Sequence, residues 1–275
     1  MISTTHRLYV LYVYAFKQFV SGSFNLNNQC MFRHKGKGRT YSHNLKLASI
    51  LSCVAGLVNI TGVLALSTLT TNVTGHFAFF SEQLFLENYR MAFIYLVYIL
   101  FFLLGAFVSG TIMEWASKSR LHTSYIIPIF IEVSIMLAVS CIPKVFLQEN
   151  PPFRIAVSSA LLFTMGLQNA LVTKVSQSVV RTTHLTGLFT DLGIELSQLL
   201  FYRERKDKIR LHKSVFLKFM IISGFFIGGI IGGFTFRHFA LKTLLLPVAL
   251  LLFALWYDRL LFRYYHFKRK FRHHD

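Results

Sequence analysis

Two long stretches of this chain contain no charged side chain and no histidine. Residues 47–69 and 91–113 lack Asp, Glu, Lys, Arg and His altogether. A helix needs about 20 apolar residues to cross the hydrocarbon core of a bilayer, and both stretches reach that length. Hydrophobic residues make up 54% of the chain, which is too apolar for an ordinary soluble domain. The sequence therefore predicts an all-α polytopic membrane protein.

Eight apolar segments follow one another along the chain in two sets of four. Segment 73–86 is too short to span, because its 14 residues cover only about 21 Å as a helix. Segment 184–200 is interrupted by Asp191 and Glu195. We therefore predict six transmembrane helices plus two half-helices. The segments are 47–69, 73–86, 91–113 and 124–142 in the first set, and 153–173, 184–200, 215–236 and 241–262 in the second.

The dipeptide Thr-Gly opens a short apolar segment in each half of the chain, which indicates an internal repeat. With three full spans in each copy, the second copy must be upside down relative to the first. We expect repeat one at 47–142 and repeat two at 153–262. The residues that recur are Asn59, Thr74 and Gly75 in the first half, and Asn169, Thr186 and Gly187 in the second.

The formal net charge of +18 comes mainly from segments that flank the apolar helices. Of 29 Lys and Arg residues, 20 lie in residues 1–46, 201–218 and 259–275. This distribution is typical of positive-inside topology and predicts that both termini are cytoplasmic. It favours anionic membrane lipids as partners and argues against nucleic acid. We expect a basic N-terminal cytosolic segment at 1–46, a membrane domain at 47–262 and a basic tail at 263–275.

Several of these motifs resemble a known family. The runs Arg181-Thr182-Thr183-His184-Leu185-Thr186-Gly187 and Gly166-Leu167-Gln168-Asn169-Ala170 are similar to those of the YoaK family, a domain-of-unknown-function family of bacterial inner-membrane proteins. Asn72-Val73-Thr74-Gly75, and Pro128 with Glu132, fit the same pattern over residues 45–262. The chain departs from it at His76, where relatives usually carry asparagine. The resemblance implies a multi-pass protein of the bacterial inner membrane.

The repeated Thr-Gly motifs are candidates for a binding site. Thr74 and Thr186 are expected to be N-caps, and Gly75 and Gly187 to allow a bend or a close approach. A helix that starts inside the membrane exposes N–H groups that attract anions or carboxylates. The alternative is a tight packing turn without a ligand.

Asn59, Gln168 and Asn169 lie in spanning segments, where an unpaired amide is costly. We expect their partners in the broken backbone near Thr74 and Thr186. Simple hydrogen bonding between helices is the alternative for these amides.

Three charged residues within the apolar segments, and Arg181 just before one of them, are candidates for coupling or binding. Glu132 lies in the middle of segment 124–142 and is expected to be protonated, because a charged carboxylate is expensive in hydrocarbon. It serves proton coupling, a neutral hydrogen bond, or a pair with Arg181. Asp191 and Glu195 share a helix face and form a proton relay, or they simply emerge near Arg203 and Arg205. Arg181 binds an anionic solute, or it is an interfacial arginine.

The predicted function is a secondary transporter or permease-like protein for a small polar or anionic solute, with proton coupling as an option. The substrate-binding candidates are Asn59, Thr74, Gly75, Asn169, Arg181, Thr186 and Gly187, and the proton-coupling candidates are Glu132 and Asp191. The alternative is a non-transporting membrane protein that binds lipid or assembles with partner proteins. No enzyme motif is present, and no cofactor or metal site is expected. The glycines Gly224, Gly228 and Gly232 are spaced for close packing within the bundle or for a homodimer seam.

Overall fold

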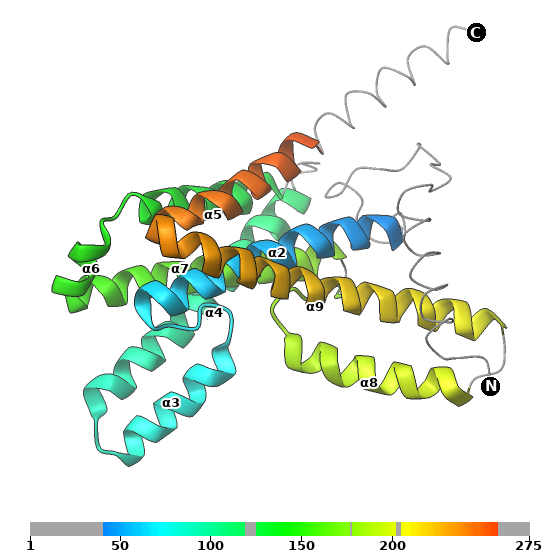
Figure 1. The fold of residues 1–275 in the computed structure, drawn as a ribbon, viewed down its shortest axis with the longest axis horizontal. Coiled ribbons are helices and arrows are strands. Elements are labelled where there is room, and N and C mark those ends of the chain that lie inside the picture. The colour runs from blue at the N-terminus through cyan, green and yellow to red at the C-terminus, as the bar shows by residue number, and fades with distance from the viewer. Residues whose placement is uncertain (1–40, 119–124, 177, 202–204, 258–275) are drawn as a thin grey trace, which may run out of the picture.

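The computed structural model describes residues 41–118, 125–176, 178–201 and 205–257. Every regular element within these ranges is helical, as predicted (Figure 1). The predicted basic segments at 1–46 and 263–275 lie mostly outside the described residues. The helices are α2 (Tyr41–Leu66), α3 (Val73–Phe85), α4 (Tyr89–Lys118), α5 (Ile126–Ser140), α6 (Lys144–Glu149), α7 (Pro151–Ser176), α8 (Leu185–Phe201) and α9 (Arg205–Phe239), followed by the 3-10 turn η2 (Ala240–Leu244) and a last helix at 245–257.

Among the described residues, four helical segments are long and apolar enough to cross a membrane. They are Asn44–Leu66, Tyr89–Lys118, Pro151–Ser176 and Asp207–Tyr257. The last has 51 residues, more than twice the length that one crossing needs. Ala240 interrupts this segment with a positive φ of 46°, so α9 and the helix at 245–257 are two separate helices. The apolar helix α5 has 15 residues and is shorter than these four.

Two pairs of helices form the body of the molecule, α2 with α9 and α4 with α7. Gly56 lies against the carbonyl of Phe225, and Gly228 lies against the carbonyl of Cys53, so that a side chain at either glycine would overlap backbone. The predicted ladder of Gly224, Gly228 and Gly232 therefore faces α2 inside the bundle. The alternative interpretation was a homodimer seam. These three glycines are already covered by α2, so they do not form such a seam.

The pair of α4 with α7 is built in the same way. Gly105 of α4 lies against the carbonyl of Phe163, and Gly166 of α7 lies against the carbonyl of Phe102. Without a Cβ on either side, the two backbones approach closely enough for dispersion contacts along the whole seam. The ion pair between Lys174 and Glu114 joins the later parts of the same two helices. The two helices therefore run in the same direction.

The two helices that we predicted as half-helices, α3 and α8, stand apart from this body. Each follows a helix whose end is succeeded by a serine with left-handed backbone, Ser67 after α2 (φ 54°) and Ser178 after α7 (φ 65°). Each then packs chiefly on the helix that comes after it, α3 on α4 and α8 on α9. Figure 1 shows α3 and α8 leading away from the middle of the molecule toward opposite sides of the view. The core lies between the body helices, and α5 and η2 close its flank.

Candidate functional site

The segment between α2 and α3 is tied back onto α2 by Asn59. The side-chain oxygen of Asn59 accepts hydrogen bonds from the backbone N–H of Thr71, at 3.3 Å, and from the Thr71 hydroxyl, at 3.0 Å. Because a backbone N–H can only donate, the oxygen of the Asn59 carboxamide must face Thr71 and its NH₂ group must face away. That NH₂ group has no hydrogen-bond partner among the described residues.

The second half has the corresponding tie on α7. The hydroxyl of Thr183 donates to the side-chain oxygen of Asn169 at 3.0 Å. Both asparagines lie seven residues before the last residue of their helix, α2 ending at Leu66 and α7 at Ser176. The partners of Asn59 and Asn169 are thus threonines three positions before Thr74 and Thr186, inside the interrupted backbone where we expected them. The third amide, Gln168, donates instead to the carbonyl of Leu51 on α2 at 2.8 Å.

The expectation that Thr74 and Thr186 are N-caps is wrong. Asn72 caps α3, and its side-chain oxygen accepts from the N–H of Gly75 at 3.0 Å and from the hydroxyl of Thr74 at 2.7 Å. Helix α8 begins at Leu185, so Thr186 lies within its first turn and is exposed. Asparagine takes the cap because its longer side chain reaches two donors of the first turn at once.

Neither Gly75 nor Gly187 has a positive φ. Their small size matters instead, because a Cβ at Gly187 would overlap the ring of His184 and one at Gly75 would press on Leu69 and Asn72. Each half-helix buries a single residue, the one that follows this glycine: His76 in α3 and Leu188 in α8. The Nε2 atom of His76 donates to the Leu69 carbonyl at 2.7 Å, which holds the interrupted backbone to the start of α3.

Several buried polar atoms, two of them at these turns, have no hydrogen-bond partner within the described parts of the chain. The hydroxyls of Thr70 and Thr182, each directly before the threonine that binds an asparagine, are fully buried and unpartnered. Glu132 is 1% exposed on α5, and neither of its carboxyl oxygens has a partner. The proposed pair of Glu132 with Arg181 is not formed, since Arg181 is exposed. Buried polar groups without partners are costly, and they are concentrated at functional sites.

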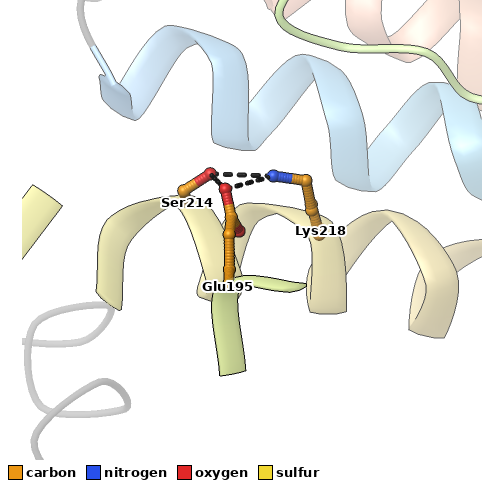
Figure 2. A network of polar contacts seen from close by, with 3 residues as sticks. All are labelled: Glu195, Ser214 and Lys218. Carbon is orange, nitrogen blue, oxygen red and sulfur yellow. Dashed lines mark hydrogen bonds and ion pairs between the residues drawn. The ribbon is translucent and has the colours of Figure 1, made fainter. Parts of the chain in front are cut away.

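The two acidic residues of α8 have different environments. Asp191 is exposed. Glu195 is half-buried, and its Oε1 atom accepts hydrogen bonds from the Ser214 hydroxyl and the Lys218 ammonium of α9, both at 2.7 Å (Figure 2). The expected emergence of Glu195 near Arg203 and Arg205 concerned residues whose side chains lie outside the described part. Its described partner is Lys218.

The sequence interpretation missed four residues of these contacts: Thr71, Thr183, Ser214 and Lys218. The two threonines carried a signal, since each stands three positions before a repeated Thr-Gly motif. Lys218 gave little signal in the sequence, because a single lysine at the start of an apolar segment is usual at a membrane interface. No hydrogen bond or ion pair within the described ranges joins Asn59 and Thr71 to Asn169 and Thr183.

The described residues contain no group of three or more His, Cys, Asp and Glu side chains placed to hold a metal ion. No curated protein matches the chain, and no solved structure matches it. A family model described as "Protein of unknown function (DUF1275)" matches residues 47–257, which include both asparagine–threonine ties and both half-helices. The chain therefore belongs to the DUF1275 family.

Proposed function

We propose that this protein is a secondary transporter for a small polar or anionic solute, a YoaK-like member of its family. Its six spans and two half-helices would form an inverted repeat, and the solute would bind where the half-helices begin. The observation that carries the proposal is the pair of matching ties, Asn59 with Thr71 and Asn169 with Thr183. The other supports come from the packing of the helices, from their direction and from the free hydrogen-bond donors.

The glycine seams support a repeat. Cys53 and Gly56 of α2 correspond to Phe163 and Gly166 of α7, in each case 110 residues later. Phe102 and Gly105 of α4 correspond to Phe225 and Gly228 of α9, 123 residues later. In both seams the first helix of one half packs against the third helix of the other half. One twofold relation between the halves would produce both seams.

The direction of the helices supports the inverted form of the repeat. Gln168, late in α7, bonds to Leu51 in the first half of α2, and Ser158, early in α7, lies 3.1 Å from Thr68 just beyond the end of α2. Helices α2 and α7 are therefore antiparallel. If α3, α4 and α5 all crossed the membrane, α2 and α7 would run in the same direction. If α3 does not cross, they run in opposite directions.

The ties also support a start of each half-helix within the membrane. Asn59 lies about 10 Å before the end of α2, so its bond to Thr71 returns the chain by that distance before α3 begins. The bonds of Gln168 to Leu51 and of Ser158 to Thr68 fix how far α7 is shifted along α2. With this shift, Asn59 lies beside the part of α7 that is about six residues before Asn169. The two asparagines would then be separated by about 9 Å along the helix axis, well inside a core of about 30 Å.

The free groups at the two turns are mainly donors. The side-chain oxygens of Asn59 and Asn169 are occupied, so their NH₂ groups are left to donate. The first-turn N–H groups of α3 and α8 and the exposed guanidinium of Arg181 add positive character. A solute rich in acceptor oxygens suits such groups. Glu132, enclosed and without a partner, is the proton-coupling candidate, and Asp191 is the second.

The test is flux into proteoliposomes across a panel of small organic and inorganic anions and neutral polar solutes. We expect saturable uptake of at least one solute, and its loss in Asn59→Val and Asn169→Val. Thr111→Val, at an exposed position of α4 whose hydroxyl bonds only within its own helix, is the matched control and should transport normally. Absence of flux across the whole panel, together with co-purified anionic lipid, would instead support the non-transporting, lipid-binding alternative.

A further inference from the structure

The two half-helices are attached to the molecule by different chemistry. Helix α3 is held on α4 by aromatic rings: the His76 ring lies 5.4 Å from the Tyr98 ring, and the Phe79 ring lies 5.3 Å from the Tyr95 ring. Helix α8 is held on α9 by the cluster of Glu195, Ser214 and Lys218 (Figure 2).

The same difference is visible at corresponding positions of the two halves. Glu195 of α8 lies 112 residues after Gln83 of α3, and the same spacing separates the two Thr-Gly motifs. Lys218 of α9 lies 123 residues after Tyr95 of α4, and the same spacing relates the seam residues of α4 to those of α9. The first half therefore has an amide and an aromatic ring where the second half has an ion pair.

The ionic cluster is the main polar attachment of α8. Only Leu188 of α8 is buried, and the apolar side chains of Phe189, Ile194, Leu196 and Leu200 are exposed. The Lys218 and Glu195 side chains are 15% and 18% exposed, so water screens their attraction much less than on an open surface. Lys218 also donates to Ser214 at 2.9 Å, which closes a three-membered network.

The cluster is incompletely satisfied. The second carboxyl oxygen of Glu195 is enclosed and has no hydrogen-bond partner among the described residues. A buried acceptor without a partner is unfavourable, so the closed arrangement offsets part of its own ion-pair energy. The polar attachment of α8 is thus held through one oxygen atom of Glu195, whereas the attachment of α3 rests on ring contacts, beside which Nδ1 of His76 is the buried atom without a partner in the described part of the chain.

We propose that the Glu195–Lys218–Ser214 cluster is a latch that holds α8 closed against α9, and that α8 is the half-helix that moves while α3 stays clamped to α4. Loss of the ion pair loosens α8 on α9, while the segment before Leu185 stays anchored by the bond of Thr183 to Asn169. This conformational asymmetry is independent of the proposed transport, because it is measured without any solute.

The test is hydrogen–deuterium exchange of the full chain in detergent, followed in peptides from α8 and from α3. Glu195→Gln and Lys218→Met should raise deuterium uptake in α8 severalfold and leave α3 unchanged. The charge exchange Glu195→Lys with Lys218→Glu should return uptake in α8 toward the wild-type level. Lys213→Met, an exposed lysine on the same helix, is the matched control and should change nothing. Tyr95→Leu, which removes a ring that packs against α3, should instead raise deuterium uptake in α3 and leave α8 unchanged.

Unchanged uptake in α8 in both single variants would overturn the latch. A rise shared equally by α8 and α3 would also overturn it, because it would show that the substitutions loosen the whole molecule. Single variants that loosen α8 but are not rescued by the charge exchange would leave the packing of these side chains, and not their ion pair, as the attachment.

Discussion

Alanine at Gly228 should destabilise the protein, and alanine at its neighbour Gly229 should not. A Cβ at Gly228 would stand more than about 1 Å inside ordinary contact with the carbonyl group of Cys53, which belongs to the backbone of α2 and cannot rotate away. A Cβ at Gly229 would meet nothing within 4 Å. The two substitutions share the same helix and the same gain in helix propensity, so their difference isolates the packing.

The magnitude follows from this difference. Replacing glycine by alanine within a helix gains about 0.5–1 kcal/mol at both positions. Overpacking a tight contact costs about 1–3 kcal/mol, because α2 and α9 must separate and weaken the contacts along their seam. We expect Gly228→Ala to be less stable than Gly229→Ala by about 1–3 kcal/mol. For a chain of this size that corresponds to about 2–10 °C in midpoint temperature.

The assay is the thermal unfolding of purified protein in detergent, followed by intrinsic fluorescence and by the loss of the monodisperse peak in size exclusion. Gly105→Ala, against the carbonyl of Phe163, should repeat the effect of Gly228→Ala, and Gly110→Ala should repeat that of Gly229→Ala. Equal stability of Gly228→Ala and Gly229→Ala would refute the close approach of α2 and α9. A loss at Gly228 without one at Gly105 would refute the equivalence of the two seams.

Three further predictions concern the topology and the candidate site. A cysteine at Asn88, in a background without native cysteines, should react with an impermeant reagent from the outer side, because α3 is too short to cross the membrane. Labelling from the cytosolic side alone would contradict the six-span topology. Glu132 should show a protonated carboxyl band in infrared spectra at pH 7 that disappears in Glu132→Gln, since its enclosed oxygens have no partner to solvate a charge; an ionised band would contradict this. Asn72→Ala should destabilise the fold by about 0.5–2 kcal/mol through the lost cap of α3, and Thr74→Ala by clearly less, as urea or thermal unfolding would show; equal losses would assign the cap differently.

The helices could be predicted from the sequence largely because hydrocarbon leaves the backbone no alternative. An apolar run without charges, such as 47–69, must satisfy its N–H and C=O groups internally, and α2 ends at Leu66. The short segment 73–86 was expected to form a short helix of its own, and α3 spans Val73–Phe85; that it is a half-helix stays a prediction. Length and apolarity decide both outcomes, and both are visible in the sequence.

The contacts of the candidate site could be predicted only in part. An amide in a spanning helix must find a partner, so a bond from Asn59 to the interrupted backbone was foreseeable. The choice of Thr71 was not, because it depends on how far the chain folds back after Ser67 takes a left-handed conformation. The cap at Asn72 was missed because Thr74 also fits the cap rule, and the start of α3 decides between them.

The ion pair of Glu195 with Lys218 could not be predicted from spacing. The two residues lie 23 positions apart on different helices, and they meet only because α8 and α9 form an antiparallel hairpin. A charge at the start of an apolar segment fits an interfacial lysine equally well. Such pairs depend on the angle between two helices, which the pattern of apolar residues leaves open.

The crossed packing of the body helices also constrains the order of biosynthesis. Helix α2 is made before the other described helices, yet it packs chiefly on α9, which begins 139 residues after α2 ends. At a translation rate of about 5–20 residues per second, α2 waits roughly 10–30 s in the membrane with the backbone at Gly56 uncovered. Helix α4 meets α7 sooner, so the centre of the protein is assembled before its first helix is enclosed. A chaperone or insertase that shelters α2 during this interval would raise the yield of correctly folded protein, and a chain truncated before α9 would be left as a substrate for membrane proteases.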